Sequence, residues 1–259
     1  MSSKHKLPPS LASSTHIGYI TSVTPFPTLT QVKAKDLVLI VEDDDSEYKI
    51  FKLPKKMPVI KAAIMPIMVS AWILLKKYYH LKKNDKVIID IEDAEGETAS
   101  IFSRAIVDTG KYIGINVLNI ANKNDLKIIE EAKRTEGSIK LGITNSTASA
   151  RAMTRLLAPN GVVVVCDNDI LESTQKDYEK IYFPIAQSIF TNVAVVGFSF
   201  NQTATVNPDW IEDGILGIEH MMNYNFFQYI ESYKEGDFKK GLDYIERTGK
   251  SVVLYKNDS

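Results

Sequence analysis

The chain of 259 residues is poor in cysteine and histidine and carries no excess of one charge. Its single cysteine, Cys166, excludes an internal disulfide, and its four histidines are scattered without the spacing of metal ligands. With 31 basic against 32 acidic residues, it has no general field that would attract nucleic acid or an anionic membrane. We therefore expect no metal site and no nucleic-acid binding.

Long apolar runs are also lacking. The longest candidate, residues 62–75, contains Pro66, Ser70 and Trp72 and falls short of the roughly 18 residues that span a bilayer. It predicts a buried helix, and we expect no membrane insertion. The Ser-rich start of the chain has no acidic residue before Asp36, as in a mitochondrial presequence, but it also has no arginine. We expect an intracellular protein, mitochondrial or cytoplasmic.

The residues that are present change their pattern near position 57. Before it, short strand-like stretches separated by prolines and an acidic turn predict an antiparallel β region. After it, apolar strands alternate with helices of about ten residues, which predicts a doubly wound α/β fold with a parallel sheet. The predicted strands are 16–23, 37–41, 48–53, 86–91, 113–120, 139–143, 161–166, 193–200 and 251–255. The predicted helices are 62–79, 98–109, 125–135, 147–157 and 210–233.

Several motifs follow one another in the order of a known family. Residues 62–66 and 70–72 read Ala-Ala-Ile-Met-Pro and Ser-Ala-Trp, and residues 81–88 read Leu-Lys-Lys-Asn-Asp-Lys-Val-Ile. Further matching stretches are 18–23 with 35–38, 114–118, 156–164 and 249–254. Together they resemble the medium-chain dehydrogenase/reductase family, above all its zinc-free quinone reductases and mitochondrial 2-enoyl thioester reductases. The resemblance implies a Rossmann-type domain next to a GroES-like β-barrel.

About half of the family's N-terminal barrel has no counterpart before residue 62. We therefore expect a flexible tail at 1–15, a truncated GroES-like β subdomain formed by 16–61 and 237–259, and a Rossmann-type domain at 62–236. Truncation is expected to expose four apolar side chains, those of Ile17, Ile20, Leu37 and Leu39. The apolar stretch 193–198 is expected to be a strand buried on both faces.

In this family, the turn after the first strand of the parallel sheet holds the pyrophosphate of a dinucleotide. Glycines there let the phosphates reach backbone N–H groups at the start of a helix. Here the turn keeps Gly96 but has Thr98 where the resemblance places a second glycine, and acids occupy positions 92, 93, 95 and 97. Acids stabilise the start of a helix, but they repel a pyrophosphate. We predict no cofactor.

The end of the second strand carries Asn119. Relatives that use NADPH place an arginine just after this strand, and NAD users place an acid there. Asn119 could bond a ribose but selects neither cofactor, so Gly96, Thr98 and Asn119 are interpreted as vestigial binding residues. No catalytic residue is identified, because Tyr19 and Tyr48 fit no catalytic motif and are interpreted as sheet residues.

Three functions compete. The first is a non-catalytic, reductase-derived subunit that acts as a structural or interaction component of a larger assembly, with a protein partner or as a homodimer. The alternative is an NAD(P)H-dependent oxidoreductase, using NADPH to reduce enoyl thioesters of CoA or acyl carrier protein, or quinones. A Rossmann methyltransferase is the third, indicated only by Asp90 near the end of the first strand.

Overall fold

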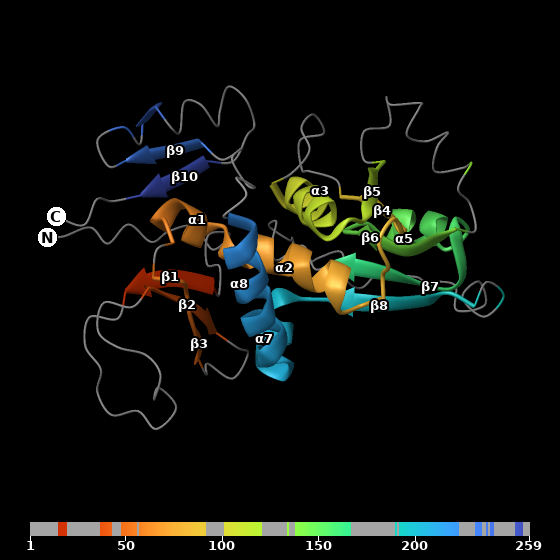
Figure 1. Cartoon of the computed structure of the whole chain (residues 1–259), viewed down its shortest axis with the longest axis horizontal. Coiled ribbons are helices and arrows are strands. Elements are labelled where there is room, and N and C mark those ends of the chain that lie inside the picture. The colour runs from red at the N-terminus through yellow and green to blue at the C-terminus, as the bar shows by residue number, and fades with distance from the viewer. Residues whose placement is uncertain are drawn as a thin grey trace, which may run out of the picture.

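The computed structural model describes the chain in thirteen parts. They are residues 15–19, 37–42, 48–55, 57–91, 101–120, 134, 138–166, 190, 192–222, 231–234, 237, 239–240 and 252–255. Within them lie a three-stranded sheet, a five-stranded sheet and a pair of strands (Figure 1). The helices α2 and α8 run between the three-stranded and the five-stranded sheet.

The five-stranded sheet is parallel throughout and has the order β5-β4-β6-β7-β8. Its strands are β4 (Lys86–Asp90), β5 (Asn116–Asn119), β6 (Ile139–Thr144), β7 (Leu157–Cys166) and β8 (Ala194–Phe198). Helices cover both faces. Val87 and Ile89 of β4 pack into the core on the side of α2, whereas Ile88 between them packs with α5 (Thr147–Met153). The predicted doubly wound α/β fold is confirmed.

The apolar run 62–75 forms two helices, α1 (Val59–Ala63) and α2 (Met65–Lys76), where the sequence predicts one. The break falls at Ile64, because Pro66 lacks an N–H and is suited to the first turn of a new helix. The hydroxyl of Ser70 donates to the carbonyl of Pro66 at 2.7 Å, so its role is in the helix, as predicted.

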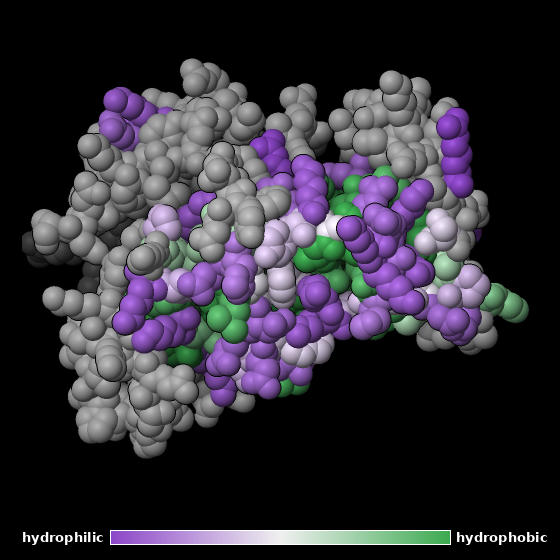
Figure 2. Space-filling view, in the orientation of Figure 1, coloured by the Kyte–Doolittle hydropathy of each residue, from purple (hydrophilic) through white to green (hydrophobic). Residues whose placement is uncertain are grey.

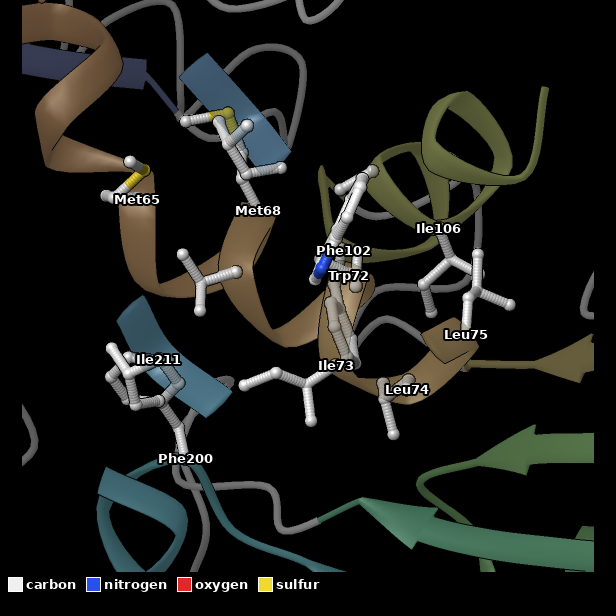
Figure 3. Close-up of a cluster of buried hydrophobic side chains, with 14 of the residues drawn as sticks. Met65, Met68, Trp72, Ile73, Leu74, Leu75, Phe102, Ile106, Phe200 and Ile211 are labelled. Atoms are coloured by element: carbon white, nitrogen blue, oxygen red, sulfur yellow. The ribbon is translucent and has the colours of Figure 1, made fainter. Parts of the chain in front are cut away.

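α2 is the centre of the larger core. Figure 3 shows its side chains lying between Phe102 and Ile106 of α3 (Ile101–Ile113) and Ile211 of α8 (Pro208–Met222). Glycines bring α8 close to α2. A Cβ built at Gly217 would lie 2.5 Å from the ring of Trp72, so no larger residue fits there without movement.

The small antiparallel sheet consists of β1 (Thr15–Tyr19), β2 (Leu37–Glu42) and β3 (Tyr48–Lys52). Tyr19 and Tyr48 are strand residues, as predicted. The prediction that Leu37 and Leu39 are exposed is wrong. They are 6% and 0% exposed, because β2 packs into the same core as α2, and α7 (Phe200–Val206) lies against it. The side chains of Ile17 and Ile20 lie outside the described residues.

Several predicted boundaries are wrong, and Gly110 shows why. The sequence predicts that α3 ends near this glycine, yet the helix continues to Ile113 and ends at Gly114, which has a φ of +78°. Gly110 is needed for packing, since a Cβ there would lie 2.4 Å from Val117. The predicted helix 210–233 is also too long, because α8 ends at Met222 and 231–234 form a strand. α7 was not predicted.

That strand, β9 (Glu231–Lys234), pairs in parallel with β10 (Val252–Tyr255), and α1 contacts β10. The two strands come from either side of the domain boundary expected at residue 236. The domain limits given above therefore remain a proposal, and the predicted helix 125–135 lies outside the described residues except for Arg134.

The prediction that residues 193–198 form a strand buried on both faces is also wrong. Their strand β8 is the last one in the order of the five-stranded sheet, and it is not buried on both faces. Ala194 and Gly197 are exposed, and Val195 and Val196 are half-buried. An apolar sequence alone does not distinguish a central strand from an edge strand, because only the pairing partners decide its place.

Candidate functional site

The carboxyl edge of the parallel sheet contains a topological switch point at β4. From β4 the chain passes to β5 on one side, and it later returns to β6 on the other. In α/β sheets, ligands bind in the crevice at such a point. Asp90 at the end of β4 pairs in register with Thr144 of β6, and Ile89 pairs with Asn119 of β5. The structure thus places Asn119 beside the end of β4.

The other two predicted binding residues, Gly96 and Thr98, lie outside the described residues, as do the acids at positions 92–97. Their role stays a prediction. Asn119 is half-buried at the end of its strand, and the backbone N–H of Ile120 after it donates to the carbonyl of Ile89 at 2.8 Å. The end of β5 is therefore bonded to β4 directly beside the switch point.

Asp90 is the polar group closest to the turn that follows β4. It is 6% exposed, and its Oδ1 has no hydrogen-bond partner among the residues that the structure describes. Burying a polar oxygen without a donor costs about 1–3 kcal/mol. The strand after which a dinucleotide site would begin therefore ends in a buried carboxyl group, one oxygen of which has no donor among the described residues.

The end of β6 uses its polar groups to begin α5. The hydroxyl of Thr144 accepts from the backbone N–H of Ser146 at 3.0 Å, and the Ser146 hydroxyl accepts from the N–H of Ser149 at 3.4 Å. Ser146 is thus the N-cap of α5. These hydroxyls are structural and are not directed at Asp90.

A second polar group lies near the ends of β7 and β8, and no pattern in the sequence marks it. The hydroxyl of Tyr78 donates to the carbonyl of Gly197 at 3.2 Å, and its ring lies edge-on to those of Phe198 and Trp210, each at 6.0 Å. Burial, followed by the charge of Cys166, raises the pKa of Tyr78 to about 12. The hydroxyl therefore stays protonated at neutral pH and acts as a donor. Cys166 is buried.

The junction of α2 and α8 holds a third polar group. Trp72 Nε1 donates to Asp213 Oδ2 at 3.1 Å, and Lys77 Nζ lies 2.9 Å from the same oxygen. Burial alone would raise the pKa of Asp213, but the hydrogen bonds from Lys77 and Trp72 and the charges of Lys77 and Lys76 outweigh it and lower the pKa. Lys76 also lies over the Trp72 ring, at 5.7 Å.

No group of three His, Cys, Asp or Glu side chains among the described residues is arranged to hold a metal ion. No helix in this part of the chain is long and apolar enough to cross a membrane.

Comparison with known proteins gives matches of structure but not of sequence. No protein-family model matches the chain, and no curated protein does. Among solved structures, the quinone oxidoreductase of Pseudomonas syringae pv. tomato DC3000 is similar at a TM-score of 0.63 and 14% identity, covering 92% of this chain and 79% of that chain. The CurK enoyl reductase is similar at a TM-score of 0.62 and 16% identity, covering 94% of this chain and 78% of that chain.

The enoyl thioester reductase Etr1p is also similar. Its complex with NADP and crotonyl-CoA matches at a TM-score of 0.58 and 14% identity, covering 85% of this chain and 73% of that chain. The mitochondrial Etr1p/Etr2p heterodimer from Candida tropicalis matches at a TM-score of 0.58 and 13% identity, with the same coverage of both chains. The chain has the fold of these reductases, so the resemblance found in the sequence is confirmed at the level of the fold.

Proposed function

We propose that this chain is a non-catalytic subunit with a reductase fold, which acts as a structural or interaction component of a larger assembly. The observation that carries the proposal is the buried Asp90 at the end of β4, whose Oδ1 has no donor among the described residues. It stands at the switch point, where a dinucleotide would need neutral or cationic surroundings. The sequence continues from it into an acidic turn.

A carboxylate close to the phosphates of a dinucleotide costs enough free energy to decide whether the nucleotide binds. One carboxylate ~4 Å from a phosphate costs up to ~4 kcal/mol at an effective dielectric constant near 20. That corresponds to roughly a thousandfold loss of affinity. Asn119 supplies no positive charge to offset the loss, so we expect no useful binding of NADPH or NADH.

A titration of the purified protein with NADPH and NADH, followed by nucleotide fluorescence, tests this expectation. The result should be no saturable signal at physiological salt. A dissociation constant in the low micromolar range for either nucleotide would contradict the proposal. The double variant Glu97→Val/Thr98→Gly should recover part of the affinity if the turn is the main defect, and no recovery would place the obstruction elsewhere.

The role in an assembly is supported by β8. Within the described residues, β8 is the last strand of the parallel sheet and pairs with β7 alone. It exposes Ala194 and Gly197 and half-exposes two valines, and strand edges without a partner invite pairing with another chain. We expect a homodimer through this edge or a different protein partner, in the mitochondrion or the cytoplasm. Size-exclusion chromatography with light scattering tests the homodimer. A monomer of 29.0 kDa, with no protein recovered alongside it from native extracts, would contradict the assembly role.

The alternative is an NAD(P)H-dependent oxidoreductase that reduces enoyl thioesters or quinones. It is favoured by the kinds of protein that share the fold, one of which forms a complex with NADP and crotonyl-CoA. The place of Asn119 beside β4 is compatible with a ribose contact. NADPH consumption in the presence of crotonyl-CoA or a quinone would establish this alternative and exclude the first proposal.

A further inference from the structure

The amino edge of the parallel sheet carries a cluster of positive charge, whereas Asp90 lies at the carboxyl edge, at the opposite end of β4. The segment from Lys76 to Lys86, which leads from the end of α2 into β4, contains five lysines, one histidine and a single acid. We call its tip, residues 81–86, the basic turn. Lys82 and Lys83 in this turn are exposed, as is His80 before it. The basic turn therefore faces solvent where β4 begins.

The basic turn is held by hydrogen bonds at several points. Asn84 has a φ of +69°, which places it in the left-handed region, and its N–H donates to the carbonyl of Gly114 at 2.8 Å. Asp85 Oδ2 accepts from the backbone N–H of Lys82 at 2.7 Å, and its carbonyl accepts from the N–H of Asn116 at 3.0 Å. The backbone that presents the two lysines is thus fixed to the end of α3 and the start of β5.

The acids near the basic turn are already in use. Asp85 Oδ1 lies 3.0 Å from Lys140 Nζ, and the hydrogen bond from the Lys82 backbone lowers the pKa of its carboxyl group, with Lys140 adding to the effect. Lys111 at the end of α3 is 3.9 Å from Asp108 and remains 67% exposed. Within the described part of the chain, no carboxylate pairs with the ammonium groups of Lys82 or Lys83.

We propose that the basic turn, with Lys82 and Lys83 at its centre and Lys111 beside it, is a docking surface for the acidic face of a partner protein. The proposal names the surface and the partner chemistry for the assembly role given above, on which it rests. A fixed backbone with exposed ammonium groups that form no ion pair among the described residues suits electrostatic recognition, which raises association rates and selects partners by charge.

A protein partner is favoured over nucleic acid for two reasons. The cluster offers only a few free cations, whereas a protein on nucleic acid typically neutralises about 6–10 phosphates. The whole chain has a formal charge of −1, so it supplies no general positive field that would hold a long polyanion beyond the cluster itself. A compact patch of carboxylates on a folded partner would touch the cluster alone.

The test uses the full chain and a fluorescein-labelled oligoglutamate peptide, with binding followed by fluorescence anisotropy at low and at physiological salt. Wild-type protein should bind with an affinity that falls as salt rises. The variant Lys82→Glu/Lys83→Glu should bind roughly tenfold more weakly and with a smaller salt dependence. Lys82→Ala/Lys83→Ala should show a smaller loss in the same direction, and it replaces the first variant if that one does not fold.

The matched control is Arg151→Glu/Arg155→Glu, which changes the charge by the same amount at two exposed residues in and after α5. It should bind like the wild type. Equal losses in both double variants would mean that only net charge matters, and this would overturn the proposal. No binding by the wild type, or tighter binding of a labelled oligouridine, would also overturn it. None of these results depends on NADPH, so the outcome is separate from that of the nucleotide titration.

Discussion

Two aspartates in this protein have opposite surroundings. Asp213, at the junction of α2 and α8, accepts a hydrogen bond from the Trp72 indole and pairs with Lys77. Asp90, at the carboxyl end of β4, is almost fully buried and leaves Oδ1 without a donor in the described residues. The first is a satisfied structural contact. The surroundings of Asp90 are not those that stability favours. Such a buried polar group is typical of a position that was shaped by something other than stability, or that needs a different group.

The difference teaches where this fold tolerates change. The α2–α8 junction joins buried apolar contacts, a close glycine approach and a paired charge, so each part depends on the others. At the carboxyl edge of β4, the described residues offer Asp90 Oδ1 no donor. Changes at the junction should therefore destabilise the protein, while a change at Asp90 should not.

The largest effect is expected for Trp72→Ala, which breaks the junction. Removing a buried indole ring and the donor to Asp213 should lower the free energy of unfolding by about 3–5 kcal/mol. Urea denaturation followed by circular dichroism measures it. Trp72→Phe keeps one aromatic ring and loses the donor and part of the indole, so it should cost clearly less. Equal losses for both would mean that the ring does not pack as described.

Gly217→Ala is the next test of the same contact. The added Cβ would lie 2.5 Å from the Trp72 ring, and such overpacking costs about 1–3 kcal/mol even though alanine favours a helix. Ala substitution at Gly197, where a Cβ would meet nothing within 4 Å, is the control and should leave thermal stability nearly unchanged. A Gly217→Ala protein as stable as the wild type would show that α8 can move away from α2.

Asp90→Val should stabilise the protein, in contrast to the two preceding variants. Replacing an unpaired buried carboxyl group with an apolar side chain of similar shape should raise the free energy of unfolding by about 1–2 kcal/mol. Asp213→Val should instead lower it by about 1 kcal/mol, a value reduced because this side chain is 47% exposed. Paired denaturation curves compare the two. If Asp90→Val destabilises the protein, then Asp90 has a partner that supports it.

Tyr78→Phe removes one hydroxyl and keeps the ring contacts with Phe198 and Trp210. The carbonyl of Gly197 loses its donor at the edge strand, which should cost about 0.5–1.5 kcal/mol. Differential scanning calorimetry should show a slightly lower Tm at neutral pH. Because the pKa of Tyr78 is about 12, the difference between the two proteins should not change with pH below about 10. A change in that range would show that the hydroxyl ionises earlier.

The smallest effect is expected for the pH dependence of stability at Asp213, under acidic conditions. The pKa of Asp213 is lowered in the folded protein, so the stabilisation from its charge is fully present above its ordinary value of 3.8 and is lost as the pH falls through the lower folded value. Asp213→Asn should therefore differ from the wild type near neutral pH, and the difference should shrink as the pH falls through the lowered pKa of Asp213. Unfolding curves at several pH values measure this, and a constant difference would mean that the ion pair contributes nothing.

Much of the fold followed from the sequence. The alternation of apolar strands and helices after residue 57 predicted the parallel sheet, and the Ala-Ala-x-x-Pro motif predicted the buried helix around Ser70. Boundaries were less certain where glycine serves packing. Gly110 looked like a helix end but lies inside α3 because Val117 packs against it. The missed helix α7 is short and begins directly after β8, at the N-cap Ser199.

The site was only partly predictable. Asn119 was placed at the end of its strand, but Asp90 entered only as a weak indication of a methyltransferase. Its lack of a donor depends on what surrounds it in three dimensions. The pairs Tyr78–Gly197 and Trp72–Asp213 join residues 119 and 141 positions apart, and no local pattern marks such contacts.

The sequence by itself determined the order of the strands and helices along the chain, the neutral total charge and the acidic turn after β4, because each of these depends on residue type and local spacing. The tertiary structure decided that Leu37 and Leu39 are buried, that β8 is the last strand of the described five-stranded sheet, and that Lys82 and Lys83 form no ion pair with a carboxylate among the described residues. These properties arise from which distant segments meet, and burial and pairing are set only by that meeting.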